Sequence, residues 1–290
     1  MKINQRSNRE AGVWARLRKA LCEPHAAGNW QTSKAVWLMA HPDDETIAAS
    51  AILSRLPGSV VIFLTDGAPR DRRFWSPDVT GSREEYAGFR RQEAIAALKL
   101  AGIPAYRSLC LGAVDQDAVF ELPRLIEDFC IVLNWFRPEF VITHAYEGGH
   151  PDHDCAALVA GVAAGLHQSS GAVELFEIPL YHARAGECTK GEFLPESGSI
   201  ENSAELRLLL TLEEHARKQA MIACYPSQRR VLQGFPLETE RLRPAPVYDF
   251  AMPPHEGKLW YECLQWPMTG AWWRDLASEA LTRFHASVCG

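Results

Sequence analysis

The chain has 290 residues, of which 47% are hydrophobic and 23% charged, and its formal net charge is −6. This composition is typical of globular proteins, and the length predicts one α/β domain with extensions. An acidic balance argues against a nucleic-acid partner, because no surplus of Lys and Arg is available to neutralise phosphates. Neither a signal peptide nor a membrane span is expected, because no apolar stretch has the required length and flanks.

Eight cysteines are spread along the chain, and none forms a Cys-x-x-Cys pair. An even number could form disulfides in a secreted protein. Several of them lie inside apolar segments, however, where a free thiol behaves as a small hydrophobic side chain. We therefore expect a cytoplasmic protein with free thiols.

The first regular elements form a βαβ unit. Residues 34–40 (KAVWLMA) and 59–65 (SVVIFLT) are short, nearly continuous apolar runs, as expected of strands that are buried on both faces of a sheet. Between them, residues 43–56 are expected to form a helix with Pro42 near its first position, where the missing N–H does no harm.

The same alternation continues towards the C-terminus. Further strands are expected at 107–111, 139–144 and 173–181, and further helices at 90–100 (after a Ser82/Glu85 capping box), 122–136, 152–167 and 211–224. Residues 185–203 are expected to form a loop or a short hairpin. The pattern predicts a Rossmann-like, three-layer α/β fold: a mostly parallel sheet with helices on both faces and an active site at the carboxyl ends of the strands.

Three segments are expected along the chain. Residues 1–33 would form an N-terminal extension, residues 34–234 the catalytic domain, and residues 235–290 an extension that is rich in Pro and Trp and packs on the same domain. The last segment contains four tryptophans, at positions 260, 266, 272 and 273. We expect them in the core or at contacts of a homo-oligomer, although an aromatic ring can also support a sugar.

The stretch AHPDDET crowds three carboxylates, Asp43, Asp44 and Glu45, directly after the first strand. Neighbouring carboxylates raise one another's cost of ionisation unless a positive charge compensates them. A bound cation would do so, whereas an isolated acidic pair is more often a solvated helix N-terminus. Glu45 lies in the first helical turn, so a capping or dipole role is expected for it.

A second polar stretch, THAYEGGHPDHD, follows the strand at 139–144. His150 and His153 are three positions apart there, as His41 and Asp44 are in the first stretch. Both stretches leave carboxyl ends of strands in one sheet, so they are expected to meet. Mixed imidazole and carboxylate ligands that leave one position for water are typical of hydrolytic zinc sites. For His144, at the end of the strand, a structural and a catalytic role are equally plausible.

AHPDDET followed by HPDH resembles the LmbE/PIG-L family of zinc-dependent deacetylases, which remove acetyl groups from N-acetylglucosamine-containing substrates. The resemblance runs from about residue 36 to residue 228. The two polar stretches are highly specific for this family. Two weaker patterns accompany them: Arg90-x-x-Glu93, and Tyr225-Pro-Ser-Gln228 after Lys218.

The resemblance implies a role for each residue of the two stretches. It implies that His41, Asp44 and His153 hold the metal, zinc or alternatively ferrous iron. It implies that Asp43 is the general base, and that His150 stabilises or protonates the reacting centre. Asp152 would orient a histidine from behind.

Contacts to the substrate are less well defined. Arg90 matches a family arginine that can contact substrate, but it could equally form a solvated ion pair with Glu93 on the same helix face. Some family members have a tyrosine two residues before the first HPDH histidine, where this chain has Gly148. Tyr146 lies further back, so the role of the tyrosine stays open.

The loop at 66–82 is too long to be a simple connection. It could close over a substrate, with Arg70, Arg72 or Arg73 meeting an anionic group and Trp75 stacking on a sugar ring. The alternative is a flexible surface loop.

The expected function is that of a zinc hydrolase that removes an N-acetyl group from a small amino-sugar conjugate and yields acetate and a free amino sugar. An alternative is an amidase that acts on a different acylated sugar, a thiol conjugate or an acylated antibiotic intermediate. A non-catalytic metal- or sugar-binding module is another, although the intact polar stretches argue against it. A dinucleotide-dependent oxidoreductase is disfavoured, because no GxGxxG follows the first strand.

Overall fold

The structure is a computed structural model, and it describes residues 2–23, 35–167, 173–195, 205–264 and 266–289. The expected N-terminal extension and the expected loop at 185–203 therefore lie partly outside the described residues. The boundaries expected between the three segments of the chain stay a prediction.

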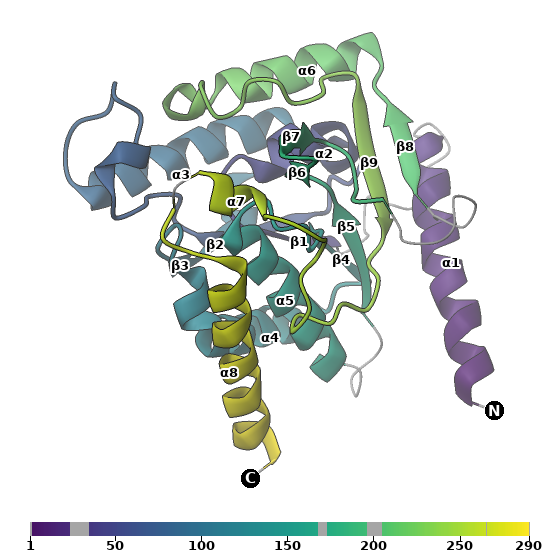
Figure 1. Cartoon of the computed structure of the whole chain (residues 1–290). Coiled ribbons are helices and arrows are strands. Elements are labelled where there is room, and N and C mark those ends of the chain that lie inside the picture. The colour runs from purple at the N-terminus through teal and green to yellow at the C-terminus, as the bar shows by residue number, and fades with distance from the viewer. Residues whose placement is uncertain (1, 24–34, 168–172, 196–204, 265, 290) are drawn as a thin grey trace.

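A seven-stranded sheet forms the centre of the molecule, with the strand order β3-β2-β1-β4-β5-β9-β8 (Figure 1). Its strands are β1 (Ala35–Met39), β2 (Val60–Thr65), β3 (Ser108–Ala113), β4 (Phe140–His144), β5 (Glu174–Ile178), β8 (Leu206–Leu209) and β9 (Thr239–Pro244). The first five strands of this order are parallel, and β9 is antiparallel to both β5 and β8. The predicted mostly parallel α/β sheet is confirmed.

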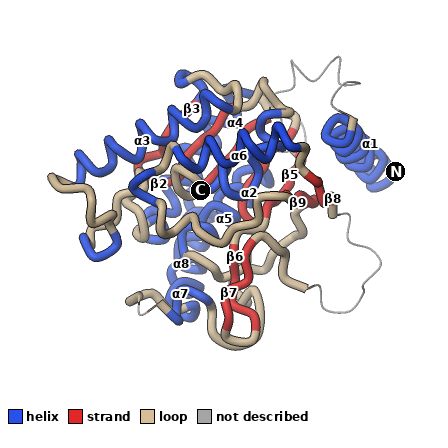
Figure 2. Tube along the Cα trace, turned by 90° about the horizontal axis from the view of Figure 1, so that it is seen from above, coloured by secondary structure: helices blue, strands red, loops and turns tan. Residues whose placement is uncertain are grey.

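Helices cover both faces of the sheet, as Figures 1 and 2 show. They are α1 (Lys2–Cys22), α2 (Asp44–Ser54), α3 (Arg83–Leu100), α4 (Leu122–Phe136), α5 (Pro151–Leu166), α6 (Leu212–Ala223), α7 (Trp260–Cys263) and α8 (Gly270–Cys289). One face packs on α1, α2, α3 and α6, and the other on α4, α5 and α8. No helix within the described ranges is both long and apolar enough to cross a membrane.

Strand β1 shows why an uninterrupted apolar run is needed at the centre of the sheet. Trp37 and Met39 belong to the core on one face, whereas Val36 and Leu38 belong to the core on the other. Successive side chains of a strand point to opposite faces, so a central strand with helices on both sides is mostly apolar on both.

The helix starts that were predicted from capping residues are confirmed for α3 and α6. Ser82 Oγ accepts a hydrogen bond from the Glu85 N–H, and the Glu85 side chain accepts one from the Ser82 N–H. Thr211 and Glu214 form the same reciprocal pair at the start of α6. Helix α2 differs from the expectation, because it begins at Asp44 and Pro42 precedes the N-cap residue Asp43.

Other differences from the expected elements have identifiable causes. The single strand expected at 173–181 is divided, because Pro179 has no N–H to donate and β5 ends just before it. The chain then forms a separate hairpin of β6 (Tyr181–Arg184) and β7 (Glu187–Lys190). Strands β8 and β9 were not expected, because β8 has only four residues and β9 (TERLRP) is mostly charged, without the apolar run or alternation that marks a strand.

Candidate metal centre

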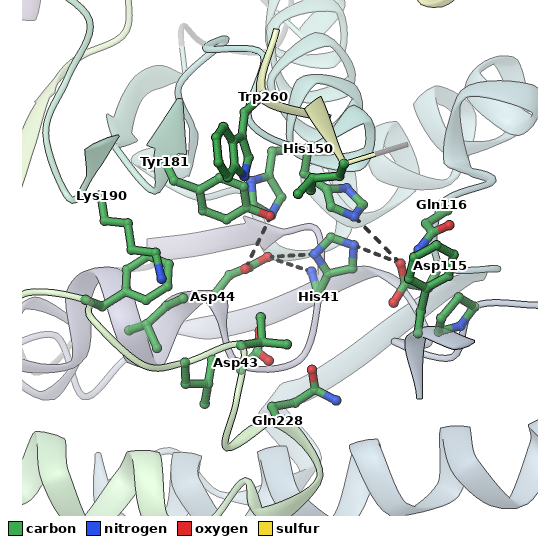
Figure 3. A pocket seen from close by; sticks show the side chains of 18 of the residues that line it. His41, Asp43, Asp44, Asp115, Gln116, His150, Tyr181, Lys190, Gln228 and Trp260 are labelled. Carbon is green, nitrogen blue, oxygen red and sulfur yellow. Dashed lines mark hydrogen bonds and ion pairs between the residues drawn. The ribbon is translucent and has the colours of Figure 1, made fainter. Parts of the chain in front are cut away.

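The two polar stretches meet at the carboxyl ends of β1 and β4 (Figure 3). These strands are direct neighbours, with Ala35 opposite Phe140 in the register. From this pair, the chain adds β2 and β3 on one side of the sheet and β5 on the other. Ligands of open α/β sheets bind in the crevice at such a switch point. The fold therefore brings His41 and Asp44 next to His150 and His153, as the sequence predicted.

Asp44 lies between two imidazoles. Its Oδ2 is 3.4 Å from His41 Nδ1, and its Oδ1 is 3.4 Å from His153 Nε2. Ring nitrogens of His41, His150 and His153 also lie within 4.8 Å of one another. Two atoms that bind one zinc ion tetrahedrally, each at about 2.1 Å, are roughly 3.4 Å apart. The two contacts use different oxygens of Asp44, and the groups whose atoms all lie within 4.8 Å of one another also include Asp44, His144 and His153. The distances suit ligands of an ion at this place, and the assignment of His41, Asp44 and His153 as its ligands stays a prediction.

The local charge balance also favours a cation. Five carboxylates gather in this region: Asp44, Asp115 and Asp152 lie within 3.4 Å of His41, Asp43 is the chain neighbour of Asp44, and Glu45 accepts the Asp43 N–H. Four of the five belong to buried residues, and Arg90 pairs with one of them, Asp43, at 3.0 Å. Buried carboxylates are costly unless positive charge compensates them. A divalent ion at Asp44 would supply that charge, which accounts for the crowded acidic residues in AHPDDET.

The pKa directions agree with this charge balance. Burial disfavours a charged His41, but the carboxylate of Asp115 and hydrogen bonds to Asp152 and Asp44 outweigh it and raise its pKa well above the usual range. Burial acts against an ionised Asp44 as well, yet His153 and His144 hold the Asp44 pKa well below its usual range. Both pKa shifts show that the surroundings of His41 and Asp44 favour positive charge, which a bound ion would supply.

Asp43 has a backbone conformation that side chains other than glycine rarely adopt, with φ 145° and ψ −21°. Such conformations cost on the order of 1 to 3 kcal/mol and persist at functional sites when the surroundings enforce them. The Asp43 side chain forms no cap bond at the start of α2, so its carboxylate is free to pair with Arg90. Burial raises the pKa of Asp43 to about 7, and Arg90 opposes this rise.

His150 is oriented by the backbone of its own helix. Its Nδ1 accepts a hydrogen bond from the Asp152 N–H at 3.1 Å, so the proton of the neutral imidazole is on Nε2. Burial, with His41 nearby, lowers the His150 pKa to about 3, which keeps the ring neutral. His150 therefore presents an N–H donor, and Nε2 lies 4.0 Å from Asp115 Oδ1.

Asp152 and His144 contact the candidate ligands, and His144 Nε2 also lies 3.3 Å from Asp44 Oδ2. Asp152 Oδ2 lies 3.2 Å from His41 Nε2 and accepts a hydrogen bond from the Gln116 N–H at 2.6 Å. His144 Nε2 accepts from the Ala40 N–H at 2.9 Å, and its ring stacks on His153 with centroids 4.4 Å apart. Asp152 thus orients His41, and His144 sets the position of His153.

A cavity of about 440 Å³ opens above the metal centre, a size at which proteins enclose small ligands. Its walls are mainly apolar: Ile47, Pro69, Phe74, Tyr181, Val231, Leu232, Phe235, Trp260, Leu264 and Trp266. Polar side chains besides the acidic and imidazole groups of the centre are Arg90, Gln116, Gln228 and Lys190. Three of these, with Tyr181 and Trp260, are labelled in Figure 3.

The residues expected to contact substrate lie in different places. Arg90 lines the cavity, so it is in reach of a ligand, and it also lies 3.7 Å from Glu93. Both side chains are buried, so the expectation of a solvated ion pair was wrong. Trp75 stacks on Tyr86 with centroids 4.7 Å apart, and Arg73 pairs with the neighbouring Asp71.

Tyr146 packs against aromatic rings and donates a hydrogen bond to the Met252 carbonyl. The cavity is not lined by Trp75, Arg73 or Tyr146; Phe74 and Pro69 are the residues of the 66–82 loop that line it.

Several residues of the site were not found from the sequence. Asp115 follows the carboxyl end of β3 and lies 3.3 Å from His41 Nε2, so the rule that placed the other ligands could have found it. Tyr181 packs edge-to-face on His153, with ring centroids 5.2 Å apart. Trp266 contacts His150 in the same way at 4.7 Å. These two have no local sequence signal, because distant parts of the chain bring them to the site.

Comparison with known proteins supports the motif-based interpretation. Residues 36–164 match the PIG-L family model, described as GlcNAc-PI de-N-acetylase. A 1D-myo-inositol 2-acetamido-2-deoxy-alpha-D-glucopyranoside deacetylase from Corynebacterium glutamicum is 29% identical over 157 residues. That match covers 46% of this chain and 53% of the relative, so the chain spans about half the length of this curated relative.

Solved structures share the fold. A teicoplanin-pathway deacetylase matches with a TM-score of 0.54 and 18% identity, over 73% of this chain and 97% of the other. The deacetylase of the A40926 pseudoaglycone matches with a TM-score of 0.55 and 20% identity, over 74% of this chain and 97% of the other. At this identity the likeness establishes the architecture.

Proposed function

Since this chain belongs to the PIG-L family, we propose that it is a zinc-dependent hydrolase that removes the acetyl group from an N-acetylglucosamine-containing substrate. The products would be acetate and a free amino sugar. The observation that carries the proposal is the carboxylate of Asp44, 3.4 Å from each of two imidazoles, with Asp43 as its neighbour. Ferrous iron accepts the same ligands, and its availability in the cell often decides between the two metals.

His41, Asp44 and His153 would hold the ion, which when bound polarises the acetamide carbonyl and makes water more acidic. Asp43 would accept the proton of the attacking water, because its carboxylate lines the cavity and carries no cap bond. The same proton would pass to the departing nitrogen when the C–N bond breaks. Arg90, 3.0 Å from Asp43, would keep the base ionised and oriented.

His150 would stabilise the negative charge that develops on the carbonyl oxygen. Its Nδ1 accepts a backbone N–H, so Nε2 carries the proton and can donate it as a hydrogen bond. The family comparison allows a protonated imidazole in this role, whereas the surroundings of this ring favour a neutral one. A neutral N–H donor still stabilises an oxyanion, because the protein orients the donor towards the oxygen before the negative charge develops.

The cavity supports a substrate class. A sugar with only hydroxyl groups needs many polar partners, but the wall around the centre is mainly aromatic and aliphatic. We therefore expect an amino sugar joined to a group with an apolar face, which would lie against Phe235, Trp260 or Trp266. A cytoplasmic location stays a proposal. It rests on the eight cysteines of the sequence, whose spacing shows no pairing pattern.

Acetate release from a panel of N-acetylglucosaminides tests the proposal. The panel would include an inositol glycoside, N,N'-diacetylchitobiose, an aryl glycoside and an alkyl glycoside, each with the zinc-loaded protein, the ferrous protein and the metal-free protein. We expect acetate release only from the metal-loaded protein, and faster release from the aryl and alkyl glycosides than from the other two. One equivalent of bound metal without release from any glycoside would contradict the deacetylase and favour a binding protein.

A further inference from the structure

The segment from Lys218 to Glu240 contacts the carboxylate side of the metal centre at three places. It follows the region matched by the family model, and it includes the Tyr-Pro-Ser-Gln pattern at 225–228. Its polar side chains do not bind the candidate metal ligands directly. Instead, they hold the residues around Asp43.

The first contact acts on the Asp43 backbone. The Tyr225 hydroxyl donates to Glu45 Oε1 at 2.9 Å, and the Thr46 hydroxyl donates to the same oxygen at 2.7 Å. Glu45 Oε2 in turn accepts the Asp43 N–H at 3.3 Å. Glu45 is fully buried, so its carboxylate depends on these partners. Tyr225 thereby fixes the Glu45 carboxylate, which binds the N–H of the strained Asp43 backbone.

The second contact acts on the Asp43 side chain. The Ser227 N–H and hydroxyl donate to the two oxygens of Glu93, at 2.8 and 2.5 Å. Glu93 lies 3.7 Å from one end of the Arg90 guanidinium, and the other end donates to Asp43 Oδ2 at 3.0 Å. Ser227 thus positions Glu93, which pairs with Arg90, and Arg90 in turn binds the Asp43 carboxylate. The two weak sequence patterns, Arg-x-x-Glu and Tyr-Pro-Ser-Gln, meet in this chain of contacts.

The third contact acts on the helix that begins at Asp43. Helix α2 is broken at Ala49, where φ is −152° and ψ is 35°. Glu240 accepts the N–H groups of Ala51 and Ile52 at 3.0 Å, as an N-cap would. Lys218, fully buried, lies 3.3 Å from Glu240. The break is therefore capped by a buried ion pair from the same segment.

We propose that residues 218–240 form a positioning brace for Asp43, with Tyr225 and Ser227 as positioning residues that set its backbone and its side chain. The brace rests on the proposed function in one respect, because Asp43 matters as a base only if the chain is a hydrolase. The prediction that these residues hold the Asp43 backbone does not depend on the proposed function.

Tyr225→Phe is the most direct test, because it keeps the ring and removes one hydroxyl. We expect kcat to fall about 10-fold to 100-fold, since small misplacements of a catalytic group have effects of that size. KM and bound metal should stay unchanged, because the ligands keep their own contacts. Hydrogen exchange of the Asp43 amide should become faster.

Ser227→Ala should lower kcat less, by about 3-fold to 10-fold, because the Ser227 N–H still donates to Glu93. Ser227→Thr keeps the hydroxyl and should restore turnover. Tyr261→Phe is the matched control: Tyr261 is also fully buried, and its hydroxyl has no hydrogen-bond partner among the described residues. This control should leave kcat and Asp43 exchange at wild-type values.

Unchanged kcat and unchanged Asp43 exchange in Tyr225→Phe would overturn the brace. So would a fall in kcat that matches an equal loss of bound metal, since the segment would then only support the fold. If Tyr225→Phe does not fold, Ser227→Ala and its threonine counterpart decide. If the wild-type protein releases no acetate, the proposed function fails, while Asp43 exchange still tests the brace.

Discussion

The two sides of the metal centre are built differently. On one side, Asp43 is held through Arg90, Glu45 and Glu93 by directional hydrogen bonds and ion pairs. On the other, His150 lies against Trp266, whose ring also contacts Phe74 edge-to-face at 5.7 Å. Hydrogen bonds fix an atom in one direction, whereas aromatic packing tolerates small shifts. We infer that the first side sets the geometry of the chemistry and the second shapes the substrate.

Both sides depend on the ligands between them, so removing a ligand should have the largest effect. In His153→Ala, Asp44 loses one of its three imidazole neighbours, and we expect loss of bound metal together with essentially all turnover. Metal analysis after dialysis, with acetate release on the same sample, measures both. Full metal content with normal turnover would exclude His153 as a ligand.

Breaking only the hydrogen-bonded side should separate turnover from metal. Asp43→Asn keeps the size of the side chain and a hydrogen bond to Arg90 but cannot take a proton. We expect kcat to fall about 10²-fold to 10⁴-fold, the usual contribution of a general base, while the metal stays bound. The measurement is kcat beside metal content; normal turnover would remove the assignment of Asp43 as the base.

Breaking only the aromatic side should affect binding more than chemistry. Trp266→Ala removes the ring that contacts His150 and Phe74, and with it part of the cavity wall. We expect KM to rise about 10-fold for glycosides with an apolar group, as loss of about 1.4 kcal/mol of binding would produce, and kcat to change less. Trp272→Ala serves as the control, because Trp272 is half exposed and does not line the cavity. Equal losses of kcat and kcat/KM would place Trp266 with the chemistry instead.

The smallest effect should come from a buried pair away from both sides. Glu177 accepts hydrogen bonds from Arg243 and Tyr248, and burial raises its pKa from 4.5 to about 7, although Arg243 opposes the rise. The folded pKa lies above the unfolded one. The stabilisation from Glu177 is therefore complete below about pH 4.5 and is lost as the pH rises through about 7.

Glu177→Gln cannot ionise, so this loss should be absent from the variant. The free energy of unfolding in urea, compared between about pH 5 and about pH 8, should fall more in the wild type, by on the order of 1 to 3 kcal/mol. Parallel pH profiles would show that Glu177 stays ionised in the folded protein. Acetate release per bound metal should be equal in the two proteins.

Local patterns in the sequence were sufficient for the five parallel strands of the sheet and for the residues of the two polar stretches, but not for β8 and β9. The apolar runs of β1 and β2 specify strands that are buried on both faces, and the end of β4 leads directly into the second stretch. From this it followed that His41, Asp44, His150 and His153 lie together. Their roles in metal binding and catalysis stay predictions.

The walls of the cavity could not be predicted in the same way, because they depend on packing between distant segments. Stacking of Trp75 on a sugar was one of two alternatives for the 66–82 loop, but this loop packs on α3, where Trp75 stacks on Tyr86. Trp266 and Phe235 come from segments without regular spacing, so no periodicity marks the faces that they present to the site. Glu45 was expected to act on the helix dipole, and its bond to Tyr225 joins residues 180 positions apart.

The adjacency of β1 and β4 has a consequence for biosynthesis. Ala40 and His144 are bonded across 104 positions of sequence, and β2, α2, α3, β3 and α4 are all made in between. On the proposed assignment, a nascent chain that exposes His41 and Asp44 would have only part of the ion-binding site, because His153 follows β4. High-affinity capture of the ion would wait until β4 docks beside β1, and a ligand that binds only the native state would then stabilise it. Metal uptake during refolding should accordingly report the closing of this strand pair.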